Sequence, residues 1–192
     1  AARVLDWREE PIGRDHDRKA FDCGSPELND YLRRHARQNH EGGGSKTFVA
    51  VAAAAPKSIL GYYSISPASI AFTKVPAALT KGLGRYEVAV FRLARLAVAL
   101  PMQGQGLGGD LLLAAGARAL AVAAQVGGVA LAIDAKDKKA AHWYERFGAM
   151  PLLDSNPLSL ILPFKAIVDA LEIAQGRSPA RSATRKKKQQ QE

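Results

Sequence analysis

An α+β domain is the fold class that the sequence predicts, for three reasons. Two β-type runs flank Pro56-Lys57-Ser58, which is typical of a hairpin. A hydrophobic strand at 88–98 is followed by a glycine-rich turn and a Leu/Ala-rich helix at 107–125. A second strand and helix follow within 129–147. At 192 residues and 47% hydrophobic composition, the chain can form one such domain with a full core, and no internal repeat is apparent.

The helix before the hairpin is predicted from local signals. Ser25-Pro26-Glu27 supplies an N-cap, a proline at the first helical position and an acid in the first turn, so a helix should run from Pro26 to about His40. Apolar residues at helical spacing predict its buried face: Leu28, Tyr31, Leu32 and Ala36. The other predicted elements are strands at 2–7, 47–53, 59–68, 88–98, 129–134 and 159–162, and helices at 107–125, 138–147 and 165–175.

The glycine-rich turn is the most informative stretch of the chain. It runs Gln103-Gly104-Gln105-Gly106-Leu107-Gly108-Gly109, at the point where a strand gives way to a helix. The backbone N–H groups at a helix N-terminus are unpaired, and glycines let an anion approach without meeting Cβ atoms. The turn therefore predicts a site for the phosphate or pyrophosphate of a cofactor.

Two familiar phosphate loops fit this sequence poorly. Gly104, Gly106 and Gly109 match G-x-G-x-x-G, but that motif requires an acidic residue about 20 residues further on. Here residues 125–128 are Gln-Val-Gly-Gly. The stretch 42–47 lacks the first glycine of a nucleotide-binding P-loop, and we interpret it as a flexible loop.

Composition excludes several classes of protein. The single cysteine excludes a disulfide framework within the chain, and the four scattered histidines form no metal-ligand cluster, so no metal is expected. No apolar run reaches the roughly 18 residues of a membrane span, and the N-terminus lacks a signal-peptide core. The helix at 107–125 is interrupted by Gly109, Asp110, Gly116 and Arg118, which favours a core helix. We expect a cytoplasmic protein without a membrane anchor.

The formal net charge of +9 is unevenly distributed. Residues 176–192 contain six Lys/Arg and one Glu, which gives +5 and leaves +4 for residues 1–175. The 176–192 segment has no apolar residue larger than alanine, so we expect a folded domain at 1–175 and a disordered basic tail. This tail would either add nonspecific affinity for phosphates or serve only to keep the protein soluble.

The glycine-rich turn also contains Q/R-x-x-G-x-G/A, as Gln103, Gly106 and Gly108, and in this it resembles the acetyl-CoA loop of the GNAT acetyltransferases. The stretch 95–98, Arg-Leu-Ala-Val, resembles the family's strand beside the pantetheine arm, and 134–148 resembles its strand, helix and Tyr-x-x-x-Gly signature. The resemblance implies the GNAT acyl-CoA N-acyltransferase fold: a mixed central sheet splayed around the cofactor and flanked by helices. The splayed strands would be about 60–68 and 92–98.

Four further stretches narrow the resemblance to the GNAT-type toxins of bacterial toxin–antitoxin modules: 21–29, 45–49, 61–63 and 158–163. Over roughly residues 3–172 it implies an acetyltransferase that modifies the amino group of aminoacyl-tRNA and blocks translation. It also implies a homodimer neutralised by a small antitoxin protein with a ribbon-helix-helix DNA-binding domain. One departure is Ala149, where many such toxins have Phe after the glycine. By this resemblance, acetyl-CoA would be bound by Leu96, Ala97, Val98, Gln103, Gly104, Gln105, Gly106, Leu107, Gly108 and Gly109.

Tyr144 is the predicted catalytic residue, because it matches the tyrosine with which the resembled toxins protonate the leaving CoA thiolate. A phenol with a pKa of about 10 is mostly protonated at pH 7 and can donate in this way. No strong general base stands out. An α-amino group has a pKa near 8, which an adjacent ester lowers, so it needs little help to lose its proton. Glu87 acting through a water is a weaker candidate base, and His142 should point away from Tyr144.

Cations in the motif-bearing segments are the candidate contacts for RNA. Arg92 and Arg95 are three apart on a strand, so they face opposite sides of the sheet unless a bulge intervenes. The three helix arginines form a basic face that could equally be an ordinary solvated face. The candidate substrate-binding residues are Arg33, Arg34, Arg37, Lys46, Arg92 and Arg95.

Two other functions stay open at this point. The first is a GNAT enzyme for an ordinary amine, such as a polyamine, a drug or a protein N-terminus. The basic composition argues against cationic substrates, which acidic pockets usually bind. The second is a non-catalytic nucleic-acid-binding module on a GNAT shell, against which the intact glycines and Tyr144 argue.

Overall fold

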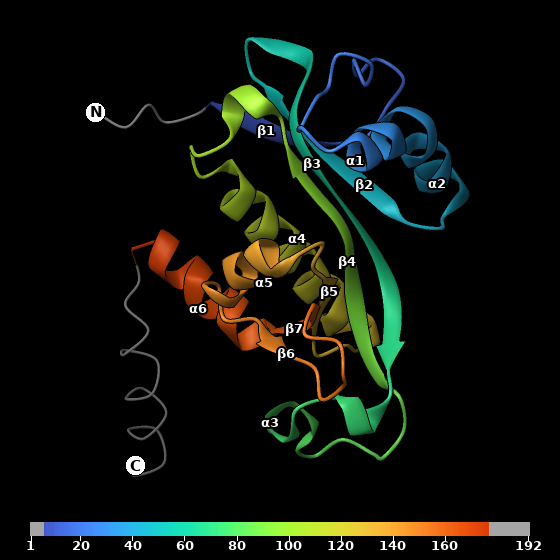
Figure 1. Ribbon diagram of the computed structural model, residues 1–192, viewed down its shortest axis with the longest axis vertical. Helices are drawn as coiled ribbons and strands as arrows, with labels where there is room; N and C mark the ends of the chain where they lie inside the picture. The colour runs from blue at the N-terminus through green and yellow to red at the C-terminus, as the bar shows by residue number, and fades with distance from the viewer. Residues whose placement is uncertain (1–5, 177–192) are drawn as a thin grey trace, which may run out of the picture.

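The structure is a computed structural model that describes residues 6–176 of the chain. Within that range, seven strands form one sheet in the order β1-β2-β3-β4-β5-β7-β6 (Figure 1). Neighbouring strands are antiparallel except β4 and β5, which are parallel, so the sheet is mixed as predicted. The predicted tail lies outside the described residues apart from Gly176. The strands are β1 (Trp7–Pro11), β2 (Lys46–Ala52), β3 (Ala55–Ile70), β4 (Val88–Val98), β5 (Ala130–Asp134), β6 (Met150–Pro151) and β7 (Ser159–Pro163).

Helices cover both faces of this sheet. α4, α5 and α6 lie on one face, where their apolar side chains join the largest core cluster. On the other face, α1 and α2 pack at one end of the long strands β3 and β4, and α3 lies near the opposite end (Figure 1). The helical segments are α1 (Pro26–Asp30), a π-helical turn (Tyr31–His35), α2 (Ala36–Gly42), α3 (Ala77–Thr80), α4 (Leu107–Val126), α5 (Lys138–Glu145) and α6 (Phe164–Ala174), with 3₁₀ turns at Phe72–Lys74 and Leu100–Met102.

Most of the predicted elements are present. β4 has the predicted bounds, and the segment predicted as one helix is helical from Pro26 to Gly42, with the π-helical turn in its middle. The hairpin forms, but its turn is at Ala53-Ala54 instead of Pro56-Lys57-Ser58. Those three residues lie in β3 at an irregularity in the pairing, because Ala52 pairs with Ala55 whereas Val51 pairs with Ile59.

Two details near the N-terminus differ from prediction. The first strand covers Trp7–Pro11, whereas it was predicted at 2–7, of which residues 2–5 lie outside the described range. Its charged residue Glu9 accepts hydrogen bonds from the Tyr63 hydroxyl at 2.9 Å and from Arg118. These partners are distant in sequence, so local patterns did not predict a strand there. Ser25 precedes α1 but its side chain makes no capping hydrogen bond.

The splay lies between a different pair of strands than predicted. β3 and β4 are antiparallel and paired along their whole common length, from Gly61 with Val98 to Ile70 with Val88. β4 and β5 pair only over Phe91–Leu93, opposite Leu131–Ile133. Beyond Leu93, β4 leaves β5, because a bulge at Ala94 bends the strand. The opening of the sheet is therefore between β4 and β5, and the prediction of 60–68 as one of the splayed strands was wrong.

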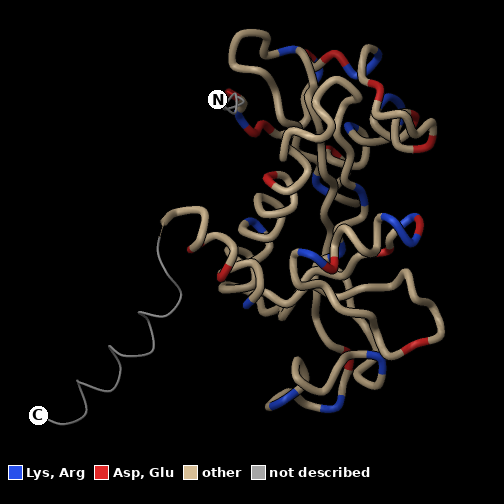
Figure 2. The backbone as a smooth tube through the Cα atoms, turned by 60° about the vertical axis from the view of Figure 1, so that its left-hand side comes forward, with Lys and Arg blue, Asp and Glu red and all other residues tan. Residues whose placement is uncertain are grey.

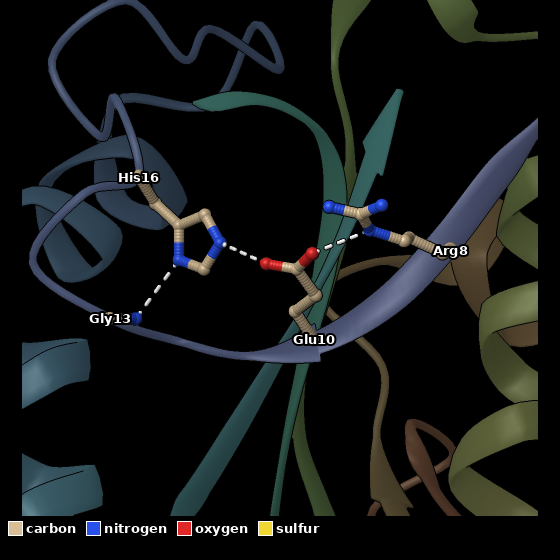
Figure 3. A network of polar contacts seen from close by, with 4 residues as sticks. All are labelled: Arg8, Glu10, Gly13 and His16. Atoms are coloured by element: carbon tan, nitrogen blue, oxygen red, sulfur yellow. Dashed lines mark hydrogen bonds and ion pairs between the residues drawn. The ribbon is translucent and has the colours of Figure 1, made fainter. Parts of the chain in front are cut away.

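A polar network fixes the chain after β1 (Figure 3). The buried His16 ring accepts a hydrogen bond from the Gly13 N–H through Nδ1, and its Nε2 lies 2.9 Å from Glu10. Arg8 contacts the other oxygen of Glu10 at 2.6 Å. These partners, His16 first, lower the pKa of the Glu10 carboxyl. The network orders the segment that leads to α1.

Helix α4 is the one described helix whose length and composition would allow it to cross a membrane. In the structure Leu111, Leu112 and Ala115 are fully buried in the central core cluster. Its N-terminus follows the glycine-rich turn directly. This arrangement is that of a core helix, as predicted.

Candidate functional site

A groove of about 800 Å³ runs from the end of β4, past the N-terminus of α4, to α5. It lies at the splay between β4 and β5. Most of the predicted cofactor-binding residues line it, namely Leu96, Ala97, Val98, Gln103, Gly104, Gly106, Gly108 and Gly109. Gln105 and Leu107 do not: the Gln105 amide donates back to the Pro101 carbonyl, and the Leu107 side chain is buried in the core. Leu107 can therefore face a ligand only through its backbone.

The turn before α4 adopts the geometry that an anion site requires. Gly104 and Gly106 have φ of 76° and 90°, the left-handed region that favours glycine. Gly106 is the N-cap residue and provides no capping side chain, so the first amides of α4 have no acceptor within the helix. Lys136, Lys139 and Arg146 line the same groove and add positive charge. Amides, helix dipole and cations together suit a pyrophosphate.

Those three cations were missed in the sequence. They belong to the 134–148 stretch, of which only Tyr144 was predicted as a site residue. For Lys139 the available signal was spacing: Lys139 and Trp143 are four residues apart on α5, as are Ala140 and Tyr144, and all four residues line the groove.

Two glycines of the turn also allow close helix packing. A Cβ at Gly109 would lie 3.1 Å from Cζ of Phe147, and one at Gly108 would lie 3.4 Å from the Trp143 ring. Gly108 and Gly109 therefore let α4 approach α5, which fixes the loop against the helix that carries Tyr144. Gln103 anchors the loop from the other side, because its Nε2 donates to the carbonyls of Val98 at 2.9 Å and Cys23 at 3.0 Å.

A second cavity, of about 480 Å³, adjoins the groove. Both share Leu96–Val98, Gln103, Lys136, Ala140 and Tyr144 as lining residues. We call the first the cofactor half and the second the acceptor half. Tyr144 lies where the two halves meet. The acceptor half is further lined by Cys23, Ser25, Glu27, Leu28, Leu93, Ala94, Arg95, Asp134 and Ala135.

Tyr144 has the surroundings of a proton donor. Its ring packs edge-on against Trp143, with centroids 4.9 Å apart. Desolvation of this largely buried side chain raises the pKa of the Tyr144 hydroxyl to about 12. Within residues 6–176 the hydroxyl makes no side-chain hydrogen bond, so its proton is available to a ligand. At neutral pH the group is protonated.

The other candidate acid–base residues lie elsewhere. His142 is exposed on α5, its Nδ1 lies 2.7 Å from the Lys138 carbonyl, and it lines neither half, as predicted. Glu87 accepts a hydrogen bond from Ser69 and borders another pocket, not either half of the groove, so its position does not support a role as a base acting through a water. Glu27 and Asp134 are the carboxylates of the acceptor half.

Comparison with known proteins identifies the family of this chain. The chain is 34% identical over 149 residues to the tRNA-acetylating toxin of Mycobacterium tuberculosis, a match that covers 78% of this chain and 87% of that toxin. This chain belongs to the tRNA-acetylating toxins with the GNAT acetyltransferase fold. A probable toxin TacT of Sinorhizobium fredii is 24% identical over 160 residues, covering 79% and 87% of the two chains. No family model matches the sequence.

Solved structures of toxins have the same fold. A mutant of the toxin KacT matches with a TM-score of 0.80 at 27% identity, covering 86% of this chain and 99% of that one. The toxin AtaT in complex with acetyl-methionyl-tRNAfMet gives the same TM-score and coverage at 26% identity. AtaT has also been solved with its antitoxin AtaR and acetyl-CoA, and KacT with KacA and DNA. The predicted GNAT fold and toxin family are therefore confirmed.

A bulge in β4 places Arg92 and Arg95 on the same face of the sheet. Phe91 and Leu93 face the core cluster beneath α4, and Ala97 faces the cluster beneath α1 and α2. In a regular strand, residues three apart point to opposite faces. Because Ala94 is an extra residue in β4, Arg92 and Arg95 instead both point to the face covered by α1 and α2. Arg95 lines the acceptor half, with its guanidinium 3.5 Å above the Tyr31 ring. Arg92 pairs with Asp134.

The remaining predicted substrate contacts lie outside both halves of the groove. Arg34 pairs with Asp30 at 2.7 Å, and Arg37 pairs with Glu41 at 2.7 Å. Arg33 donates to the Phe21 carbonyl, and Lys46 donates to the His40 carbonyl. Much of the positive charge of this helical face is therefore balanced within the helix itself, and Arg95 is the predicted cation that the acceptor half contains.

Proposed function

We propose that this protein transfers the acetyl group of acetyl-CoA to the α-amino group of an aminoacyl-tRNA and thereby blocks translation as a toxin. Membership of the tRNA-acetylating toxin family supports the reaction. The observation that carries it is the position of Tyr144 between a phosphate-binding half and a separate acceptor half. In AtaT and KacT the bound tRNA, acetyl-CoA and antitoxins are consistent with the same assignment.

The cofactor half suits acetyl-CoA. The amides of residues 103–109 would hold the pyrophosphate, with Lys136, Lys139 and Arg146 adding charge. The β4 edge at Leu96–Val98, which faces away from β3 and lacks a β5 partner, would pair with the amide groups of the pantetheine arm. Acetyl-CoA supplies the acetyl group as a thioester. This arm would bring its carbonyl to Tyr144, where the two halves of the groove meet.

Tyr144 acts on the leaving group. As the amine nitrogen forms its bond to the carbonyl carbon and the carbon–sulfur bond breaks, Tyr144 donates its proton to the departing thiolate. The amine gives up one proton, which restores Tyr144 through solvent. An unbound α-amino group is partly neutral near pH 8, so the acceptor half needs only to orient it.

The pH dependence of the reaction follows from these two groups. We expect kcat/KM to rise between about pH 6 and 8, as the acceptor amine loses its proton, and then to stay level to at least pH 10. Tyr144 must be protonated to donate, and because its pKa is raised to about 12, the falling limb lies above pH 10. Aminoacyl-tRNA with an amide in place of its labile ester allows the profile to be measured at high pH. A falling limb centred at pH 9 or below would exclude Tyr144 as the donor.

The substrate side of the proposal rests on fewer contacts. Arg95 would meet the acceptor end, and Arg33, Arg34, Arg37, Lys46 and Arg92 would contribute only where RNA displaces their present partners. We also propose that the protein is a cytoplasmic homodimer, and that a small antitoxin with a ribbon-helix-helix domain neutralises it. Its catalytic domain would cover residues 1–175, followed by a basic tail at 176–192.

The deciding experiment incubates the purified protein with radiolabelled acetyl-CoA and charged total tRNA, beside uncharged tRNA and free amines. We expect label in charged tRNA alone, and sequencing of the labelled fraction then names the isoacceptor. Label only in the free amines would favour a metabolic acetyltransferase. Failure to bind acetyl-CoA by calorimetry would favour a non-catalytic module.

A further inference from the structure

The segment 71–87, between β3 and β4, combines a buried inner side with a cationic and aromatic outer side. Val75 is buried, and Phe72 and Leu79 pack on the same apolar cluster as β4 and β5. The outer side presents Lys81, Arg85 and Tyr86. The Tyr86 side chain is 84% exposed, the most exposed of the large hydrophobic side chains between residues 6 and 176. The segment is therefore anchored, while its polar end is free to meet a partner.

The two cations of this outer side are not balanced by carboxylates. Among the described residues, neither Lys81 nor Arg85 forms an ion pair, and Glu87, the only acid in 71–87, is hydrogen-bonded to Ser69. Segment 71–87 lies at the lower end of the molecule in Figure 2, where several positions are coloured as Lys or Arg. Arg34 and Arg37 of the helical face, in contrast, are both paired with acids.

This outer side lies on the substrate face of the sheet. A pocket of about 370 Å³ lies between segment 71–87 and the acceptor half, because Asp134 borders both cavities, and Ala71, Lys74 and Glu87 of the segment line the pocket. α1 and α2 flank the acceptor half at one end of β3 and β4, and segment 71–87 lies at the other end (Figure 1). A large substrate whose reactive end enters the acceptor half can therefore extend over this segment.

We propose that Lys81, Arg85 and Tyr86 form a second tRNA contact, in which the two cations bind backbone phosphates and the Tyr86 ring stacks on an unpaired base. An exposed aromatic ring next to unpaired cations is a combination that binds single-stranded nucleic acid. The ring is partly positioned beforehand, since a Cβ at Gly84 would lie only 3.1 Å from Cδ2 of Tyr86. This inference rests on the proposed function and names a contact for the same substrate.

The test compares a charge-reversal pair with a matched control. Lys81→Glu/Arg85→Glu should raise KM for charged tRNA by roughly tenfold or more. The slope of the logarithm of tRNA affinity against the logarithm of salt concentration should fall by the amount expected for the loss of about two phosphate contacts. kcat/KM for a small aminoacyl ester should stay unchanged. The control is Arg14→Glu/Lys57→Glu, which changes the net charge equally at two exposed positions near the opposite end of the sheet and should leave tRNA kinetics unchanged.

Two further variants separate stacking from charge. Tyr86→Ala should weaken tRNA binding about five- to tenfold, whereas Tyr86→Phe, which keeps the ring, should bind like the wild type. The inference would be overturned if the wild type acetylates charged tRNA and both Lys81→Glu/Arg85→Glu and Tyr86→Ala keep its KM for tRNA. That result would leave the proposed function intact. A wild type that labels no charged tRNA would instead overturn the proposed function.

Discussion

Tyr144→Phe should lower the rate of acetyl transfer by about 10²- to 10⁴-fold, the range expected for loss of a general acid. Phenylalanine keeps the ring that packs against Trp143, so the fold and the groove should be preserved. Acetyl-CoA binding should change by less than about threefold, because the proposed contacts with the cofactor are backbone amides and cations of other residues. Single-turnover acetylation of charged tRNA measures the rate, and calorimetry measures the binding.

The matched control for this variant is His142→Ala, which removes an exposed side chain of the same helix that lines neither half of the groove. It should acetylate at the wild-type rate. A Tyr144→Phe enzyme within about threefold of the wild type would mean that the leaving thiolate needs no protein acid, and the role of Tyr144 would then be limited to packing.

Gly61→Ala should destabilise the domain by about 2–3 kcal/mol, because the added methyl group has no space. A Cβ at this position would lie 2.9 Å from the Ala97 carbonyl oxygen and 2.8 Å from Cδ1 of Leu111. Leu111 is fully buried and the carbonyl belongs to the backbone of β4, so neither can move away cheaply. The displaced part of β4 lines the cofactor half, so acetyl-CoA affinity should fall as well. Urea denaturation measures the free energy of unfolding.

Gly42→Ala is the control for Gly61→Ala. Gly42 ends α2 with no atom within 4 Å of the added Cβ and no positive φ, so this variant should unfold at the same urea concentration as the wild type or slightly above it. Equal stability of the two variants would show that β4 can shift at Ala97 at little cost in free energy. The close packing of β3, β4 and α4 would then not determine the shape of the groove.

The backbone part of the cofactor half was predictable from sequence because its segments are local. The glycine turn, the preceding strand and the following helix are consecutive, and each carries its own backbone signal. The acceptor half was not predictable in the same way. Cys23 and Glu27 meet Arg95 and Asp134 there only because the sheet brings distant segments together. The bulge at Ala94, which places Arg92 and Arg95 on one face, also depends on pairing with β3.

The ion pairs of the helical face were predictable from the sequence alone. Asp30 precedes Arg34 by four residues, and Glu41 follows Arg37 by four, which is the spacing of ion pairs along a helix. This spacing favours an ordinary solvated face for Arg34 and Arg37, which is one of the two interpretations that the sequence left open. The two-residue strand β6 and the short helix α3 carried no detectable signal, because such short elements are stabilised by their neighbours.

The three residue pairs that join β4 to β5 are the only parallel pairing in the described sheet, and the cofactor half opens directly beside them. A ligand that bridges this gap binds the folded protein and not the unfolded chain, so its concentration contributes to the free energy of unfolding. At 100 times its dissociation constant, acetyl-CoA would add about 2.7 kcal/mol. The lifetime of this protein in a cell should therefore follow the supply of acetyl-CoA, so that a starved cell both acetylates less and retains less of the enzyme.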